Sequence, residues 1–357
     1  MPNFLDLPRE LRDHIYESIA FCRQPDVFQK LRHDNWKDGR KATNYKFEFS
    51  KNDGSKVLYS TTPFEPIGLD NLSTLRSLKG ANRQIQAETL EFLHRIDKKT
   101  SYELDVALIN NENLIPAWVS VPALVKHVKK LRIEIHAVSF ERAQWGPWSS
   151  GNVPDYLWSF YGILERFLHV GPKGPTLRLQ QKHTGFRSFF IDLFPKEKKK
   201  FSIQTLEINI VTPNPEFLVY DSDDNEGARG EALAISGRVL ENFQNFFGVL
   251  LSMDIVQKNS DWNSWEYRAI PSSLLYESIG TFKLLHDGRF KKEWDLDELL
   301  RTIEISSEFQ NRCWEHMYFK VFRTPARIFE YWHMQVQAER AKYGLSNATG
   351  RPNDTLR

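Results

Sequence analysis

The chain has 357 residues, 41% of them hydrophobic and 13% aromatic, which is enough to bury a substantial core in one or two domains. Its 48 Lys and Arg residues nearly balance 46 Asp and Glu residues, and a formal net charge of +2 argues against a dedicated nucleic-acid-binding protein. The two cysteines, Cys22 and Cys313, lie far apart without a C-x-x-C pair, which excludes a thiolate zinc cluster and a disulfide framework.

Neither the start of the chain nor its most apolar stretch predicts a membrane segment. Asp6, Arg9 and Glu10 interrupt the region where a signal peptide needs an unbroken apolar run, and FQNFFGVLLSMDIV at 243–256 is too short to span a bilayer. We therefore expect a soluble intracellular protein, cytoplasmic or nuclear, that binds no membrane.

The first predicted element is an amphipathic helix over 5–21, LDLPRELRDHIYESIAF. Pro8 suits the first helical position, and Glu10 places a carboxylate at the positive end of the helix dipole. Leu11, Ile15 and Ile19 recur every fourth residue and line one face, whereas the other faces carry Arg9, Arg12, Asp13 and Glu17. This apolar stripe is expected to dock either on its own domain, against Leu78, Ile85 and Phe92, or on another protein.

Helices and strands then alternate irregularly. Two short alternating runs at 45–49 and 57–59, separated by Asn52-Asp53-Gly54, predict a hairpin, and a three-four spacing predicts a helix over 73–96. Period-two alternation predicts strands at 102–109, 131–138 and 202–211. Apolar residues at helical spacing predict a helix at 154–169, and a long helical run predicts another at 231–253. Residues 280–290 read as a strand followed by an Asp-Gly turn, a sequence that can form a hairpin, and a last helix runs from Pro325 to a stop at Gly344. These elements predict an α+β fold: an N-terminal helix, an irregular hairpin insertion, then a sheet flanked by helices with a helical C-terminus.

Catalytic and metal motifs are absent from the sequence. Ser236 lies in AISGR, which lacks the first glycine of a G-x-S-x-G nucleophile elbow. His286-Asp287 could belong to a catalytic pair, but the neighbouring sequence offers no nucleophile. None of the ten histidines has a metal-ligand partner at helical or loop spacing, so we expect no enzyme activity, no metal and no cofactor.

Two further features have to be weighed as possible contact sites for a partner. The basic run KEKKK at 196–200 is typical of a solvated turn and does not indicate nucleic-acid binding. Trp145 and Trp148 lie on a Gly/Pro loop and are candidate anchors for a protein partner, or else they cover the core.

The opening helix resembles the first helix of an F-box. The F-box pattern opens with Leu-Pro and Glu-Leu and continues with an Ile, and here these residues are Leu7, Pro8, Glu10, Leu11 and Ile15. The chain is similar to a group of uncharacterised filamentous-fungal F-box and F-box-like proteins, also in LKGANRQIQAETLEFLH, YGILERFLHVGP and LLYESIGTFKLLHDGRFKKEWDL. A stretch of about 23–72 separates the first helix from the NRQI segment, unlike the compact three-helix unit of an ordinary F-box.

The resemblance implies a substrate receptor of a cullin-RING ubiquitin ligase. Its adaptor-binding residues, which would contact a Skp-type adaptor, are Leu7, Pro8, Glu10, Leu11, Ile15 and Ile19. It also implies an F-box-like helical region at 1–98 with the hairpin-containing insertion at about 23–72, and an α+β body at 99–344 packed with it that binds an unknown protein target. The residues beyond Gly344, at 345–357, are expected to form a disordered tail. Two alternatives stay open: an adaptor-independent structural scaffold, and an enzyme or small-molecule binder whose site is invisible as a motif. An exposed apolar stripe on the first helix would favour the adaptor, and a buried one would favour the scaffold.

Overall fold

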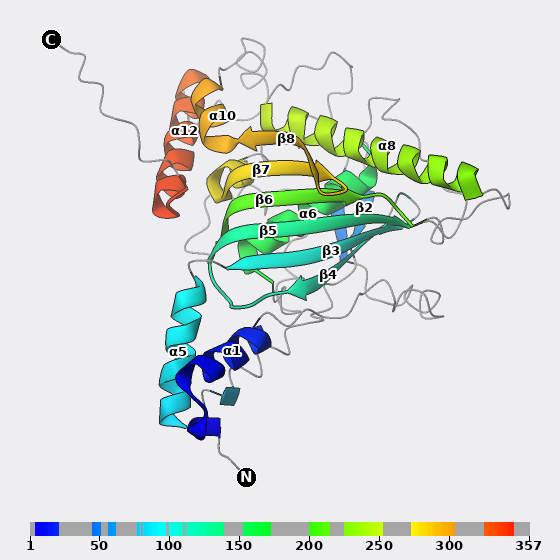
Figure 1. Ribbon diagram of the computed structural model, residues 1–357. Coiled ribbons are helices and arrows are strands. Elements are labelled where there is room, and N and C mark those ends of the chain that lie inside the picture. The colour runs from blue at the N-terminus through cyan, green and yellow to red at the C-terminus, as the bar shows by residue number, and fades with distance from the viewer. Residues whose placement is uncertain are drawn as a thin grey trace.

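A computed structural model describes residues 4–20, 45–50, 56–61, 77–78, 80, 82–97, 100–109, 111, 113–138, 153–172, 200–214, 225–252, 273–303 and 325–345. Over these ranges the chain has the predicted mixed α+β fold, in which helices pack on an eight-stranded sheet (Figure 1). Within the same ranges, no helix combines the length and the hydrophobicity that crossing a membrane requires.

The elements follow the predicted order. A short 3₁₀ turn, η1 (Phe4–Asp6), leads into α1 (Arg9–Ala20), and the hairpin β1 (Tyr45–Ser50) and β2 (Lys56–Thr61) comes before α5 (Arg83–Asp97). The body then contains β3 (Ser101–Ile109), β4 (Asn113–Ser120), β5 (His127–Val138), α6 (Asp155–Val170), β6 (Ser202–Val211), α8 (Asn225–Ser252), β7 (Ile279–His286), β8 (Arg289–Asp295), α10 (Leu296–Thr302) and α12 (Pro325–Lys342). The sequence periodicity therefore located most of the elements to within a few residues.

The sheet has the strand order β1-β2-β4-β3-β5-β6-β7-β8. Its centre, β3-β5-β6-β7, is parallel, whereas β4 and β8 pair antiparallel with the outer members of that set. The predicted hairpin β1–β2 is confirmed and joins β4 through a single pair, Thr61 with Leu114. Helices α6 and α8 connect successive parallel strands, which is the usual connection between such strands.

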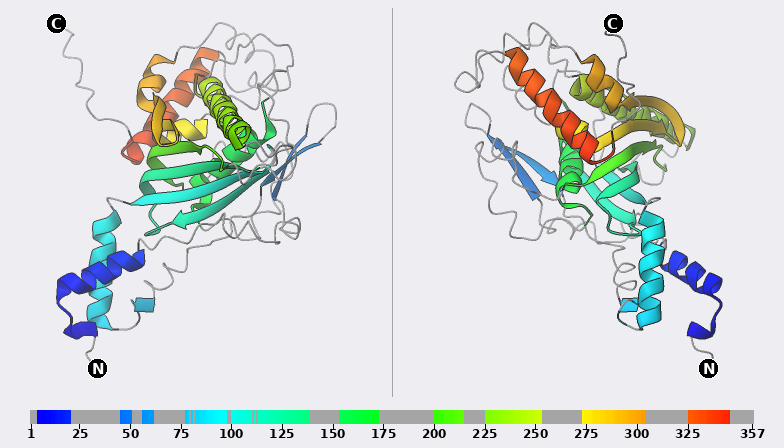
Figure 2. Two further views of the ribbon diagram at one scale, coloured as in Figure 1. Left: turned by 45° about the vertical axis from the view of Figure 1, so that its right-hand side comes forward. Right: turned by 90° about the vertical axis from the view of Figure 1, so that its left-hand side faces the viewer.

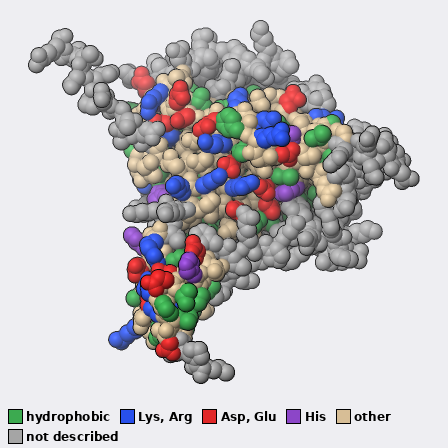
Figure 3. All heavy atoms as spheres, viewed as in Figure 1, with side chains coloured by type: hydrophobic (Ala, Val, Ile, Leu, Met, Phe, Trp, Pro, Cys, Tyr) green, Lys and Arg blue, Asp and Glu red, His purple; other side chains and the backbone are tan. Residues whose placement is uncertain are grey.

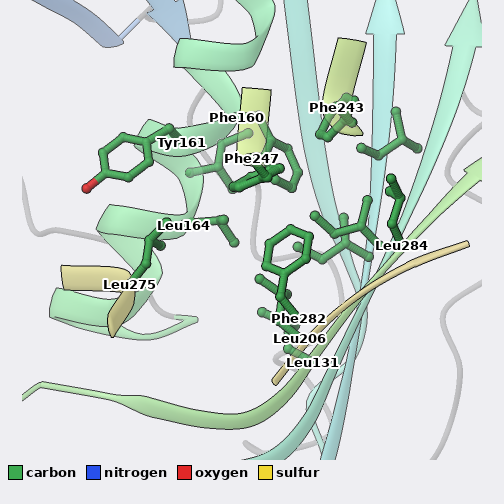
Figure 4. Close-up of a cluster of buried hydrophobic side chains, with 14 of the residues drawn as sticks. Leu131, Phe160, Tyr161, Leu164, Leu206, Phe243, Phe247, Leu275, Phe282 and Leu284 are labelled. Carbon is green, nitrogen blue, oxygen red and sulfur yellow. The ribbon is translucent and has the colours of Figure 1, made fainter. Parts of the chain in front are cut away.

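The main core lies between one face of this sheet and helices α6 and α8. Alternate residues of the parallel strands point into it, and aromatic side chains of the two helices meet them (Figure 4). The Phe247 ring lies 4.3 Å from that of Phe282, and Phe160 contacts both Phe243 and Phe247 edge to face. Contacts between aromatic rings of this kind add to the free energy gained from burying apolar area.

Two elements went unpredicted, β4 and α10. Pro116 lies inside β4, and a proline argues against a strand because it donates no ladder hydrogen bond. The strand tolerates it because β4 is nearly an edge strand, paired along its length with β3 only. Helix α10 has only seven residues, too few for a helical period to show.

Helices α1 and α5 form a pair that projects from one end of the sheet-bearing body (Figures 1 and 2). They share a small core cluster of their own, separate from the main one. At the opposite end of the chain, α12 is held through Arg340, whose buried guanidinium donates to the carbonyl oxygens of Tyr276 and Ile279.

Candidate functional site

The buried side of α1 is built from Tyr16 and Ala20. Both are almost fully buried and pack against Phe92 of α5. The Tyr16 ring lies 6.0 Å from the rings of both Phe4 and Phe92. These contacts fix which face of α1 turns towards α5.

A buried ion pair reinforces this contact. The Arg12 guanidinium donates to both carboxylate oxygens of Glu88, at 2.9 and 2.7 Å, and to the carbonyl oxygens of Leu5 and Leu7. Tyr16 donates to the same carboxylate at 3.1 Å. Hydrogen bonds from Arg12 lower the pKa of Glu88 to about 2, although burial acts in the opposite direction. The sequence pattern placed Arg12 on a polar outer face; that prediction is wrong, because Glu88 satisfies the buried charge.

Further ion pairs surround the buried one. Asp13 accepts from Arg9 at 3.0 Å and from Arg95 at 2.7 Å, and Arg9 also reaches Glu91 at 3.1 Å. Burial alone would raise the pKa of Asp13, but the hydrogen bonds from Arg95 and Arg9 hold that pKa below its usual range. The orientation of α1 on α5 is therefore set by several charges as well as by packing.

Four of the six predicted docking residues are exposed, and the other two are half-buried. Leu11 is 50% exposed and Ile15 36% exposed, and neither belongs to the small cluster around Phe92 on which the internal alternative relied. Pro8, which lies just before the first helical residue, and Glu10 are also exposed. Leu7 and Ile19 are half-buried, and Ile19 packs on the small cluster, as Leu78 also does. The stripe is thus divided between the home core and the surface.

The other candidate anchors, Trp145 and Trp148, lie outside the described residues, as do residues 346–357 of the predicted tail and most of the insertion at about 23–72.

A second candidate region is the face of the sheet opposite α6 and α8. Figure 3 shows basic and acidic side chains gathered across this face. The strand register aligns one row of alternating charge across five strands: Glu103, Arg132, Glu207, Lys283 and Glu293. We call this surface the charged sheet face.

Much of this charge is compensated locally. The Lys130 Nζ lies 2.8 Å from Glu207 Oε2, and the Arg132 Nη2 lies 2.6 Å from Glu134 Oε1. Lys283 pairs with Glu293 at 3.3 Å. Exposed pairs of this kind contribute little to stability.

On the charged sheet face, Asp105, Glu134 and His136 come together. One potential ligand atom of each lies within 4.8 Å of the others, and all three side chains are partly exposed. Sequence spacing gave no sign of this group, because Asp105 is on β3 and the other two residues are on β5. The expectation of no metal rested on helical and loop spacing, which cannot reveal ligands that two paired strands bring together.

A polar cluster also forms where β6 and β7 end. His286 Nε2 lies 3.0 Å from Ser236 Oγ on α8, and Thr212 Oγ1 lies 3.2 Å from the same hydroxyl. The neighbouring sequence offers no nucleophile, as expected, but the fold brings the Ser236 hydroxyl to His286. The hydroxyl comes from a helix 50 residues earlier in the chain, so the local sequence could not reveal it.

This cluster does not have the geometry of a Ser-His-Asp triad. The Asp287 Oδ2 lies 3.7 Å from Nε2, the nitrogen that also faces Ser236, whereas a triad places its acid on the opposite ring nitrogen. Ser236 is fully buried and its hydroxyl donates to the Leu233 carbonyl at 3.1 Å.

Thr212 instead holds the β7–β8 turn. Its backbone N–H and its hydroxyl each donate to the Asp287 carboxylate at 2.7 Å. Burial alone would raise the pKa of Asp287, but these hydrogen bonds hold the pKa below its usual range. The predicted Asp-Gly turn is confirmed, with positive φ at both Asp287 and Gly288.

Comparisons of the chain with protein-family models, with curated proteins and with solved structures gave no match. The F-box resemblance accordingly stays a prediction.

Proposed function

We propose that this chain is a non-catalytic intracellular interaction protein, an F-box-type substrate receptor whose helix α1 binds a Skp-type adaptor while the α+β body binds a protein target. The single observation that carries the proposal is the exposure of Leu11 and Ile15 on a helix whose other side is already occupied. Two adjacent turns of α1 therefore present apolar side chains that the described part of the chain leaves half uncovered. A cytoplasmic or nuclear location belongs to the same proposal.

The rigidity of α1 supports a docking role. The Arg12–Glu88 pair and the Tyr16 contacts fix the rotation of the helix, so Leu11 and Ile15 keep one direction before any partner arrives. A preorganised surface loses less conformational entropy on binding than a disordered one. The exposed part of the stripe, Leu11 and Ile15, also favours the adaptor over the adaptor-independent scaffold, for which a buried stripe was expected.

The size of the contact follows from the exposed fractions. Burying a whole Leu or Ile side chain contributes about 1.5–3 kcal/mol. Leu11 is 50% exposed and Ile15 36% exposed. Covering what remains exposed would contribute roughly 2 kcal/mol together, which corresponds to about a 30-fold change in Kd.

The test is the double substitution Leu11→Asp with Ile15→Asp in the full chain, measured by isothermal titration against a purified Skp-type adaptor. We expect binding to weaken by more than about 30-fold, because two carboxylates would face an apolar contact. The melting temperature should change little, since surface substitutions usually shift the free energy of unfolding by about 0.5 kcal/mol or less.

Leu233→Asp is the matched control, because Leu233 on α8 is 55% exposed and lies far from α1 in the sequence. It should leave adaptor binding unchanged. Wild-type protein that does not bind a Skp-type adaptor would refute the ligase proposal. A melting temperature of the double variant well below that of the wild-type chain would show that Leu11 and Ile15 stabilise the fold instead.

A further inference from the structure

Asp105, Glu134 and His136 are brought together by the pairing of β3 with β5. Strands β3 and β5 pair in parallel over nine consecutive residues, and Asp105 is directly opposite Glu134. His136 is two residues beyond Glu134, so both side chains project from the same face of β5. Three potential ligands thus stand on a rigid backbone, where a binding site keeps its geometry better than it does on loops.

The Glu134 carboxylate is held in one orientation. Arg132 Nη2 donates to Oε1 at 2.6 Å, and Asn209 Nδ2 approaches the same oxygen at 3.5 Å. Asn209 is itself buried, and its own oxygen accepts from the Gly288 N–H at 2.8 Å. The other carboxylate oxygen, Oε2, lies 3.9 Å from His136 Nε2. Residues behind a metal ligand commonly orient it in this way.

From this arrangement we propose that Asp105, Glu134 and His136 bind one divalent transition-metal ion, with Zn²⁺ as a well-suited member of that class. One imidazole nitrogen and two carboxylates form a mixed ligand set that suits zinc, manganese or iron, whereas Ca²⁺ and Mg²⁺ prefer oxygen ligands alone. The ligand atoms, now within 4.8 Å of one another, have to close to roughly 3–3.5 Å to surround an ion at about 2.1 Å. Small rotations of the Asp105 and His136 side chains can supply this closure.

The local charge also suits a cation. Asp105 and Glu134 are like charges directly opposite each other on neighbouring strands, an arrangement that is destabilising by itself. Arg132 pairs with Glu134, and a bound dication would offset the repulsion between the two carboxylates. Among the described residues three potential ligands come together and all are partly exposed, so the ion would keep coordination positions for water or for a group of a partner. The proposed metal site lies on the sheet, so it does not depend on what α1 binds.

The test uses the metal-free full chain and Zn²⁺, measured by equilibrium dialysis, with Co²⁺ as a spectroscopic probe of nitrogen and oxygen coordination. We expect one ion per chain, and we expect Glu134→Gln and His136→Ala each to weaken binding by at least about tenfold. Matched controls are Glu103→Gln, on the same face one row away, and His14→Ala, an exposed histidine of α1. Both controls should bind as tightly as the wild-type chain.

Asp105→Asn separates loss of a ligand from loss of the fold. Without metal this variant should still fold and show one cooperative unfolding transition, because Asn keeps the size of the Asp side chain. With Zn²⁺ the wild-type melting temperature should rise while that of the variant should not. Wild-type protein that binds no Zn²⁺, or ligand variants that bind it as tightly as the controls, would overturn the proposal.

Discussion

Replacing Glu88 by Gln is expected to loosen α1 from α5 without unfolding the sheet. The substitution preserves the size of the side chain but removes the negative charge that Arg12, Tyr16 and Gln84 all contact. Glu91→Gln is the matched control on the same helix, because the Glu91 side chain is 63% exposed and pairs only with Arg9 among the described ion pairs.

The expected magnitude follows from burial. The Glu88 side chain is 6% exposed, and removing one partner of a buried ion pair typically costs about 3–5 kcal/mol because the other charge stays buried. The Gln oxygen can still accept one hydrogen bond, so we expect about 2–4 kcal/mol for Glu88→Gln. The Glu91 control, an exposed pair, should cost no more than about 1 kcal/mol.

Amide hydrogen exchange resolved along the chain is the appropriate assay. Because the cluster around Tyr16 is separate from the main core, we expect faster exchange in α1 and α5 of the Glu88 variant and unchanged exchange in β5 and β6. Equal protection of α1 in both variants would show that the buried ion pair does not hold the helix.

The same carboxylate predicts a pH dependence. Hydrogen bonds from Arg12 lower the folded-state pKa of Glu88 to about 2 from an ordinary value of 4.5, so its stabilising contribution is complete above pH 4.5. The contribution should disappear progressively as the pH falls from 4.5 towards about 2, because protonation removes the charge. Exchange of the α1 amides should therefore lose this acid dependence in Glu88→Gln.

Two further predictions concern the body. Phe247→Ala should lower the free energy of unfolding by about 3–5 kcal/mol in denaturant titration, because the ring is fully buried against Phe282 and Phe160; a cost below about 1 kcal/mol would contradict this description of the core. Gly171→Ala should cost about 1–3 kcal/mol by the same measurement, because its φ is 73° and a Cβ would lie 2.3 Å from Phe201. Gly248→Ala, inside α8 with nothing within 4 Å, should instead be neutral or stabilising, and the reverse order would refute this reasoning.

The sequence by itself determined the elements, because hydrophobic period is a local property. Alternation at period two located β3, β5 and β6, an apolar stripe located α6, and a long helical run located most of α8. The turn at 287–288 could also be predicted locally, because Asp-Gly is a residue pair that adopts positive φ at both positions, as these two residues do. Elements without such a signal, such as β4 with its internal Pro116, were missed.

Only the tertiary structure decided which side chains meet. The buried face of α1 contains Arg12, which no hydrophobicity pattern selects, because its partner Glu88 lies 76 residues further along the chain. Asp105 joins Glu134 and His136 because β3 and β5 pair in parallel with one particular register. Register and helix orientation depend on contacts between residues distant in sequence, so a periodicity, which describes only neighbours along one element, cannot specify them.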